Sequence, residues 1–234
     1  EQAWATSEEI SHSVFVQYLE ALCQQYDCHI VSGLNEREGE CLYNSAVLVG
    51  PQGCRGMYRK LHLFMNEQDF FQPGNLGLPV WDISPCRVGM LVCFDWIFPE
   101  AWRVLALKGA DLICHPSNLV LPGLAQQAIP IHALTNRVYV VTANRIGTER
   151  DLTFTGMSVI AGPRGKVLAQ ASQTKAEARV VEVDIKVARN KSVTARNHIL
   201  ADRRPEEYGL LTEEKGTLAP GSLHNTSEAP TQSG

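Results

Sequence analysis

An alternation of short apolar runs with helical patterns constrains the fold of this chain more than any other feature. Between residues 80 and 145 the sequence moves repeatedly from a β-type run to a segment with helical spacing. The predicted strands cover 80–83, 87–94, 111–117 and 138–145, and the predicted helices cover 99–110 and 124–137. Strands that alternate with helices in this way are typical of an α/β protein.

Hairpin and helix patterns flank this central region. Turn residues at 51–53 and 163–165 separate pairs of strand-like runs, which predicts hairpins over 43–60 and 155–171. Ile10, Val14, Tyr18 and Leu22 recur at four-residue steps, with Phe15 and Leu19 beside them, so a helix is expected over 8–26. A strand is expected after it, at 29–33. A last strand is expected over 178–185. The sheet should therefore be mixed.

Composition divides the chain and excludes several classes of protein. Residues 1–211 have ordinary globular composition, whereas 212–234 are rich in Ser, Thr, Gly, Pro and Glu and are predicted to be a disordered tail. The net charge of −4 and the lack of a Lys/Arg-rich run argue against a nucleic-acid partner. No apolar stretch reaches the roughly 18 residues of a membrane span, and the acidic start is not a signal peptide.

The cysteines indicate a reducing compartment. Seven cysteines are scattered along the chain without a CxxC pair. An odd, scattered set does not fit a secreted disulfide framework or a structural zinc site, so we expect a cytoplasmic protein.

One cysteine lies where α/β proteins place their sites. In GMLVCFDWIFPEAW, residues 89–102, Cys93 ends a buried run and precedes a predicted helix. A thiolate there gains from nearby backbone N–H groups, and the N–H of Phe94 could act as an oxyanion donor beside it. The alternative is an inert cysteine in a buried strand.

A second stretch, YRKLHLFMNEQDFFQPG at 58–74, carries the other candidate groups. Lys60 ends a predicted strand, and the loop after it contains His62, Glu67 and Asp69. Considered alone, Lys60 would be a solvated residue at a sheet edge. His62 fits a structural role better than a place in a pocket.

Together these stretches resemble the carbon–nitrogen hydrolase (nitrilase) superfamily. YRKLHLF is similar to the lysine motif of that family, and GMLVCFDWIFPE is similar to its cysteine motif. HPSN at 115–118 and TANRIG at 142–147 also resemble segments of the family. The resemblance covers about residues 8–208, and the loop after the lysine is closest to the amidase and N-carbamoyl amidase branches.

The resemblance implies a fold and a set of roles. The fold would be an α-β-β-α four-layer sandwich, paired into a homodimer or larger assembly. Cys93 would be the nucleophile, and Lys60 with the Phe94 N–H would stabilise the tetrahedral intermediate. Glu67 would order the lysine or the substrate, and Asn118 would lie in the wall of the substrate pocket. No metal or organic cofactor is implied.

The expected reaction is hydrolysis of a small linear amide or N-carbamoyl compound through a thioester, with release of ammonia. Hydrolysis of a nitrile to an acid and ammonia is the second possibility. A thiol redox protein is disfavoured, because the nearest cysteine, Cys86, lies on the same predicted strand as Cys93.

The family's general-base glutamate has no counterpart in this chain. In the family, that glutamate lies on an early strand before the amphipathic helix, and Glu1 does not match its motif. The first strand, first helix and second strand of the family are missing. We expect the chain to be a piece of a longer enzyme and nearly inactive as it stands, with Glu67 at best a weak substitute base. The rival interpretation is a non-catalytic binding or assembly module.

Overall fold

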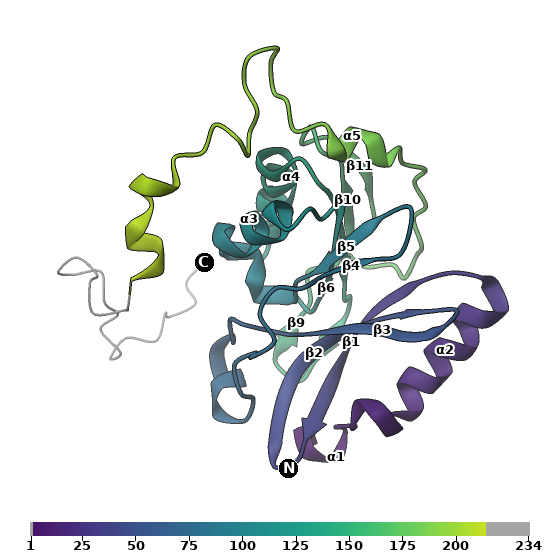
Figure 1. Cartoon of the computed structure of the whole chain (residues 1–234). Helices are drawn as coiled ribbons and strands as arrows, with labels where there is room; N and C mark the ends of the chain where they lie inside the picture. The colour runs from purple at the N-terminus through teal and green to yellow at the C-terminus, as the bar shows by residue number, and fades with distance from the viewer. Residues whose placement is uncertain (1, 214–234) are drawn as a thin grey trace. The chain divides into compact units, whose positions relative to one another are not determined.

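The computed structural model describes residues 2–213 (Figure 1). Two compact units are distinguished, one ending at Leu200 and the other beginning at Ala201. In the described part of the second unit, two short 3-10 helices, η4 (Pro205–Glu207) and η5 (Gly209–Thr212), follow each other. The predicted disordered tail lies outside the described residues except for 212 and 213, and the predicted domain boundary at 211 stays a prediction.

The first sheet of the larger unit is an antiparallel meander. Its order is β1 (Ile30–Glu38), β2 (Cys41–Gly50) and β3 (Gly53–Arg59). Because side chains alternate along β2, Val47 and Val49 pack in one hydrophobic cluster, and Ala46 and Leu48 pack in another on the opposite face. The predicted hairpin over 43–60 is confirmed.

Helix α2 (Val14–Tyr26) covers the first of these faces. Two short helices, α1 (Gln2–Ala5) and η1 (Ile10–His12), come before it. The predicted start at residue 8 is wrong, because the Ser13 side chain accepts a hydrogen bond from the Val16 N–H at 3.0 Å and caps the helix there. The predicted apolar face is correct only in part: Leu19 is buried and Phe15 packs beside it, whereas Tyr18 is exposed.

The second sheet is mixed, as predicted. Strands β5, β6 and β7 pair in parallel and the remaining neighbours pair antiparallel. In spatial order the strands are β11 (Val167–Gln170), β10 (Val159–Ala161), β7 (Tyr139–Asn144), β6 (Leu112–Ser117), β5 (Arg87–Met90) and β4 (Val80–Asp82). A separate small hairpin joins β8 (Thr148–Glu149) to β9 (Leu152–Thr153).

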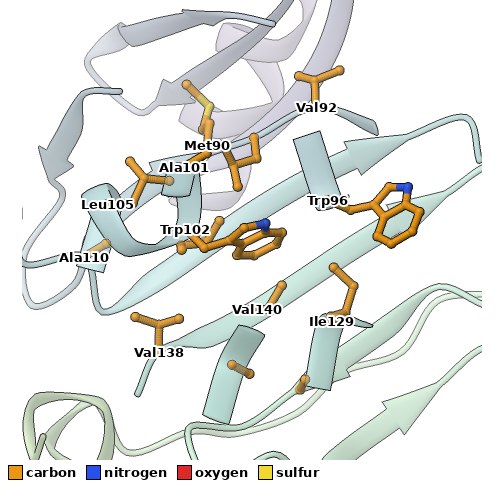
Figure 2. Close-up of a cluster of buried hydrophobic side chains, with 14 of the residues drawn as sticks. Met90, Val92, Trp96, Ala101, Trp102, Leu105, Ala110, Ile129, Val138 and Val140 are labelled. Carbon is orange, nitrogen blue, oxygen red and sulfur yellow. The ribbon is translucent and has the colours of Figure 1, made fainter. Parts of the chain in front are cut away.

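The main core lies between this sheet and two helices, α3 (Pro99–Leu107) and α4 (Leu124–Asn136). Figure 2 shows Trp102 and Leu105 of α3 and Ile129 of α4 in one cluster with Val140 of β7. Leu48 and Tyr58 of the first sheet belong to the same cluster, so the two sheets pack face to face. The layers run helix, sheet, sheet, helices, which confirms the predicted α-β-β-α sandwich.

Two predicted strands differ from the structure. Strand β5 ends at Met90, not at residue 94, because the Asp95 carboxylate accepts the Val92 N–H at 2.9 Å and draws the chain into a 3-10 turn, η3 (Cys93–Ile97). The strand expected over 178–185 has no ladder partner in the described part of the chain. Its Val180 is 95% exposed, and Asp184 caps a short helix, α5 (Ile185–Arg189).

All seven cysteines lie in the described part of the chain and are free. None of the helices between residues 2 and 213 has the length and apolar character needed to span a membrane. Within the same residues, no group of three or more metal-binding side chains comes together.

Candidate active site

Cys93 lies in a strained turn at the carboxyl end of strand β5. Its φ of +46° is in the left-handed region, which residues other than glycine rarely adopt. The turn begins three residues after the strand ends, so the predicted strand-to-helix position of Cys93 holds although the predicted strand was too long. A non-glycine residue held in this conformation is a common feature of functional turns.

The Asp95 carboxylate ties this turn to the segment that carries Lys60. Asp95 is fully buried and accepts hydrogen bonds from the Tyr58 hydroxyl and the His62 ring nitrogen Nδ1, both at 2.7 Å. It also accepts the backbone N–H groups of Val92 and His62. Because Tyr58 and His62 lie on either side of Lys60 in sequence, Asp95 holds the thiol and the lysine segments together. Nothing in the spacing of the sequence had indicated this role.

Lys60 is buried rather than solvated. Its side chain is 0% exposed, and its Nζ donates to Glu67 Oε2 at 2.5 Å. Glu67 also accepts the Phe64 N–H at 2.8 Å and the Asn44 side-chain amide at 3.0 Å. A buried ammonium without a partner would be costly, so Glu67 both neutralises Lys60 and fixes its position. The structure thus brings together two of the side chains predicted for the site.

The electrostatics of Cys93 combine opposing effects. Burial is the largest, and it raises the pKa of the Cys93 thiol. The charge of Lys60 and a hydrogen bond from the Asn118 backbone act in the opposite direction, but the pKa stays above its ordinary value. Burial therefore opposes formation of the thiolate, the form in which a cysteine acts as a nucleophile.

A small cavity opens beside Cys93. Its volume is about 20 Å³, room for roughly one water molecule. The side chains around it are mainly apolar and none is charged: Phe64, Cys93, Phe94, Trp96, Asn118, Leu119, Val120 and Leu121. Cys93, Phe94 and Asn118 therefore line the same cavity. Lys60 and Glu67 do not line it, although the charges of both act on Cys93.

A buried histidine, His115, and a partly buried one, His132, support the same turn. His115 Nε2 donates to the carbonyl oxygen of Cys93, and His132 Nε2 donates to that of Trp96, each at 2.8 Å. The structural role that the sequence favoured for His62 is borne out by its bonds to Asp95. The contribution of His132, on helix α4, could not be read from its local sequence, which is an ordinary helical pattern.

The overall arrangement is that of the nitrilase superfamily. A crystal structure of a carbon–nitrogen hydrolase from Helicobacter pylori G27 matches with a TM-score of 0.77 and 27% identity, over 86% of this chain and 76% of that one. The family model for carbon–nitrogen hydrolases matches residues 2–192. The chain belongs to the carbon–nitrogen hydrolase family.

Two curated relatives show the range of the family around this chain. A nitrilase from Pyrococcus abyssi is 48% identical over 208 residues, which are 89% of this chain and 79% of the relative. An N-carbamoylputrescine amidase from Arabidopsis thaliana is 30% identical over 198 residues, 75% of this chain and 66% of the relative.

Proposed function

We propose that this protein hydrolyses the carbon–nitrogen bond of a small linear amide or N-carbamoyl compound, with Cys93 as the nucleophile. The observation that carries the proposal is the ion pair of buried Lys60 with partly buried Glu67, whose charges act on a partly buried thiol in a strained turn. A buried ammonium beside a nucleophile is suited to stabilising an oxyanion.

The reaction follows from these groups. The Cys93 thiolate attacks the carbonyl carbon, a carbon–sulfur bond forms, and the π electrons move to the oxygen. Lys60 and the Phe94 N–H stabilise that oxyanion. Its collapse breaks the carbon–nitrogen bond, and the leaving nitrogen takes a proton and departs as ammonia. Water then hydrolyses the thioester to the acid and restores the thiol.

We expect weak turnover by the 234-residue chain itself. Glu67 and Asp95 are the carboxylates whose charges act on the Cys93 thiol, and both oxygens of each already accept hydrogen bonds. Neither is free to take the thiol proton. The resemblance assigns the base to a glutamate that has no match among these 234 residues, which is the reason that we expect slow turnover.

The cavity indicates which acyl groups fit. Its lining is apolar apart from Cys93 and the Asn118 amide, so an uncharged, short acyl group is favoured next to the reacting carbon. Hydrolysis of a nitrile is the second candidate, and the name of the relative with 48% identity favours it.

Ammonia release from short amides, N-carbamoyl amines and nitriles tests the proposal. The assay compares the chain, a form extended upstream from its gene, and Cys93→Ala in both. Cys41→Ala is the matched control, because Cys41 is also a free and partly buried cysteine. We expect loss of activity only in Cys93→Ala, and the preferred substrate identifies the branch.

Two results would overturn this function. Folded proteins that release no ammonia from any substrate would favour the binding-module interpretation. Turnover that survives Cys93→Ala would remove the nucleophile. Rapid turnover by the 234-residue chain would contradict our expectation about the missing base.

We further propose a cytoplasmic homo-oligomer. The free cysteines support a reducing compartment. On helix α4, Ile131 is 56% exposed and Leu134 is 38% exposed, which supports pairing across a helix face. Sedimentation of the protein and of Ile131→Glu tests this, and a monomer at all concentrations would contradict it.

A further inference from the structure

Two carbonyl groups of the Cys93 turn accept hydrogen bonds from histidine side chains on different elements. His115 on strand β6 donates to Cys93 O, and His132 on helix α4 donates to Trp96 O. Trp102 packs against both imidazoles, stacked on His132 at 4.6 Å between ring centroids and edge-on to His115 at 5.7 Å. Figure 2 shows its indole in the middle of the core. The two histidines therefore have little freedom to move.

The protonation of His115 is set by its surroundings. Burial lowers its pKa to about 4, so the ring is uncharged at neutral pH. Because Nε2 must carry the proton that it donates to Cys93 O, Nδ1 is left as an acceptor. Nδ1 lies 3.1 Å from the hydroxyl of Thr142, which can donate to it. The ring is thus fixed in one tautomer and one orientation.

The hydrogen bond from His115 acts on a particular peptide group. The Cys93 carbonyl and the Phe94 N–H are the two ends of one planar trans peptide, so they point in opposite directions. Holding the carbonyl toward His115 therefore aims the Phe94 N–H away from His115. Donation to the carbonyl also polarises the peptide and strengthens its N–H as a donor. Phe94 itself lines the cavity beside the thiol.

We propose that His115 is a positioning residue that aims and polarises the Phe94 N–H as the oxyanion donor. The inference rests on the proposed function, because it assumes that a tetrahedral oxygen forms next to Cys93. His132 provides the contrast. The peptide that it holds carries the N–H of Ile97, a residue that is 46% exposed and does not line the cavity.

Reversible binding of butyraldehyde measures this donor without the need for turnover. The Cys93 sulfur adds to the aldehyde carbon, the carbonyl π pair moves to oxygen, and the thiol proton goes to that oxygen. The product places a tetrahedral carbon and its oxygen where the oxyanion would be. Protection of Cys93 from iodoacetamide, followed by mass spectrometry on the peptide that contains it, gives the half-protecting concentration.

Three variants separate the roles. His115→Leu removes the donor, and we expect the half-protecting concentration to rise at least about tenfold, a partial form of the 10²–10³ loss seen when an oxyanion donor is deleted. His115→Gln keeps a side-chain N–H donor and should recover most of the affinity. His132→Leu removes the matched donor from the same turn and should stay within about twofold of wild type.

Alkylation without aldehyde is the internal control. Displacement of iodide forms no oxyanion, so its rate on Cys93 should stay within about twofold of wild type in all three variants. An equal loss of aldehyde affinity in His115→Leu and His132→Leu, slower alkylation in His115→Leu, or no protection of the wild-type thiol would overturn the inference. These results are distinct from a failure of the proposed function, which is read from ammonia release.

Discussion

At the scale of single residues, Asp95 links the thiol to the lysine. Both carboxylate oxygens accept hydrogen bonds, from Tyr58, Val92 and His62. Asp95→Asn replaces one of these oxygens by an NH2 group, which cannot accept a hydrogen bond and would point at the donors. We expect this to lower the free energy of unfolding by on the order of 3 kcal/mol. Urea unfolding measures it. Tyr58→Phe removes one donor to Asp95 and the acceptor of the Leu61 N–H, and it should cost about 2 kcal/mol.

An exposed aspartate provides the control for that change. Asp82 accepts a single backbone N–H, from Ser84, at an exposed turn. Asp82→Asn should change stability by no more than about 0.5 kcal/mol. Equal costs for Asp82→Asn and Asp95→Asn would show that the Asp95 network contributes little to holding the turn.

The sequence indicated the site residues through their motifs but not the contacts that hold them. Cys93 and Lys60 could be predicted because each lies in a long stretch that resembles a family motif. The link through Asp95 joins segments 33 and 37 residues apart, and a donor and an acceptor at such separations leave no local pattern. The contact of His132 with the Trp96 carbonyl could not be predicted for the same reason, because the two residues are 36 positions apart.

At the scale of elements, the errors arose where tertiary contacts override local patterns. Strand 178–185 was predicted from its valines, but a strand needs a hydrogen-bonded neighbour, and none is present among the described residues. In α2 the four-residue spacing predicted that Tyr18 would be buried. Tyr18 is exposed, and Val16 and Leu19 face the sheet. Periodicity identified the helix, and packing selected its buried face.

The contact between the two sheets gives a prediction about β3 and β4. A Cβ on Gly56 would lie 2.0 Å from Trp81 Nε1, so the indole packs directly on the backbone of β3. Gly56→Ala should cost about 1–3 kcal/mol, because a rigid ring must move. Chemical denaturation tests it. In a Trp81→Val background the clash is gone, and Gly56→Ala should cost less than about 0.5 kcal/mol.

A second glycine separates a clash from backbone strain. Gly39 has a φ of +57°, and a Cβ added to it would meet no atom within 4 Å. Gly39→Ala should therefore cost about 1 kcal/mol from its left-handed conformation, with or without Trp81. If removal of Trp81 rescued both alanine variants equally, or neither, steric contact at Gly56 would not be the cause.

At the scale of the whole molecule, His115, which is buried, and His132, which is partly buried, make stability depend on pH. Burial holds the pKa of His115 near 4, below the ordinary 6.5, and lowers that of His132. The unfolded chain therefore binds more protons than the native protein between these values. Above pH 7 the histidines do not change the free energy of unfolding. It falls as the pH drops from about 6.5 toward 4, and below pH 4 the contribution of His115 changes no further. The shift of His115 corresponds to about 3 kcal/mol.

His115→Gln isolates this contribution, because glutamine cannot titrate and keeps a donor for the Cys93 carbonyl. We expect wild type to lose more unfolding free energy than His115→Gln between pH 7 and pH 4.5, measured by urea unfolding at matched ionic strength. Carboxylates whose pKa is lowered by their partners, such as Glu8 and Glu38, weaken both proteins alike at the acid end. The difference between the two curves therefore reports His115 alone. Parallel curves would mean that His115 titrates normally in the folded protein, and hence that its ring reaches solvent rather than bracing the Cys93 turn.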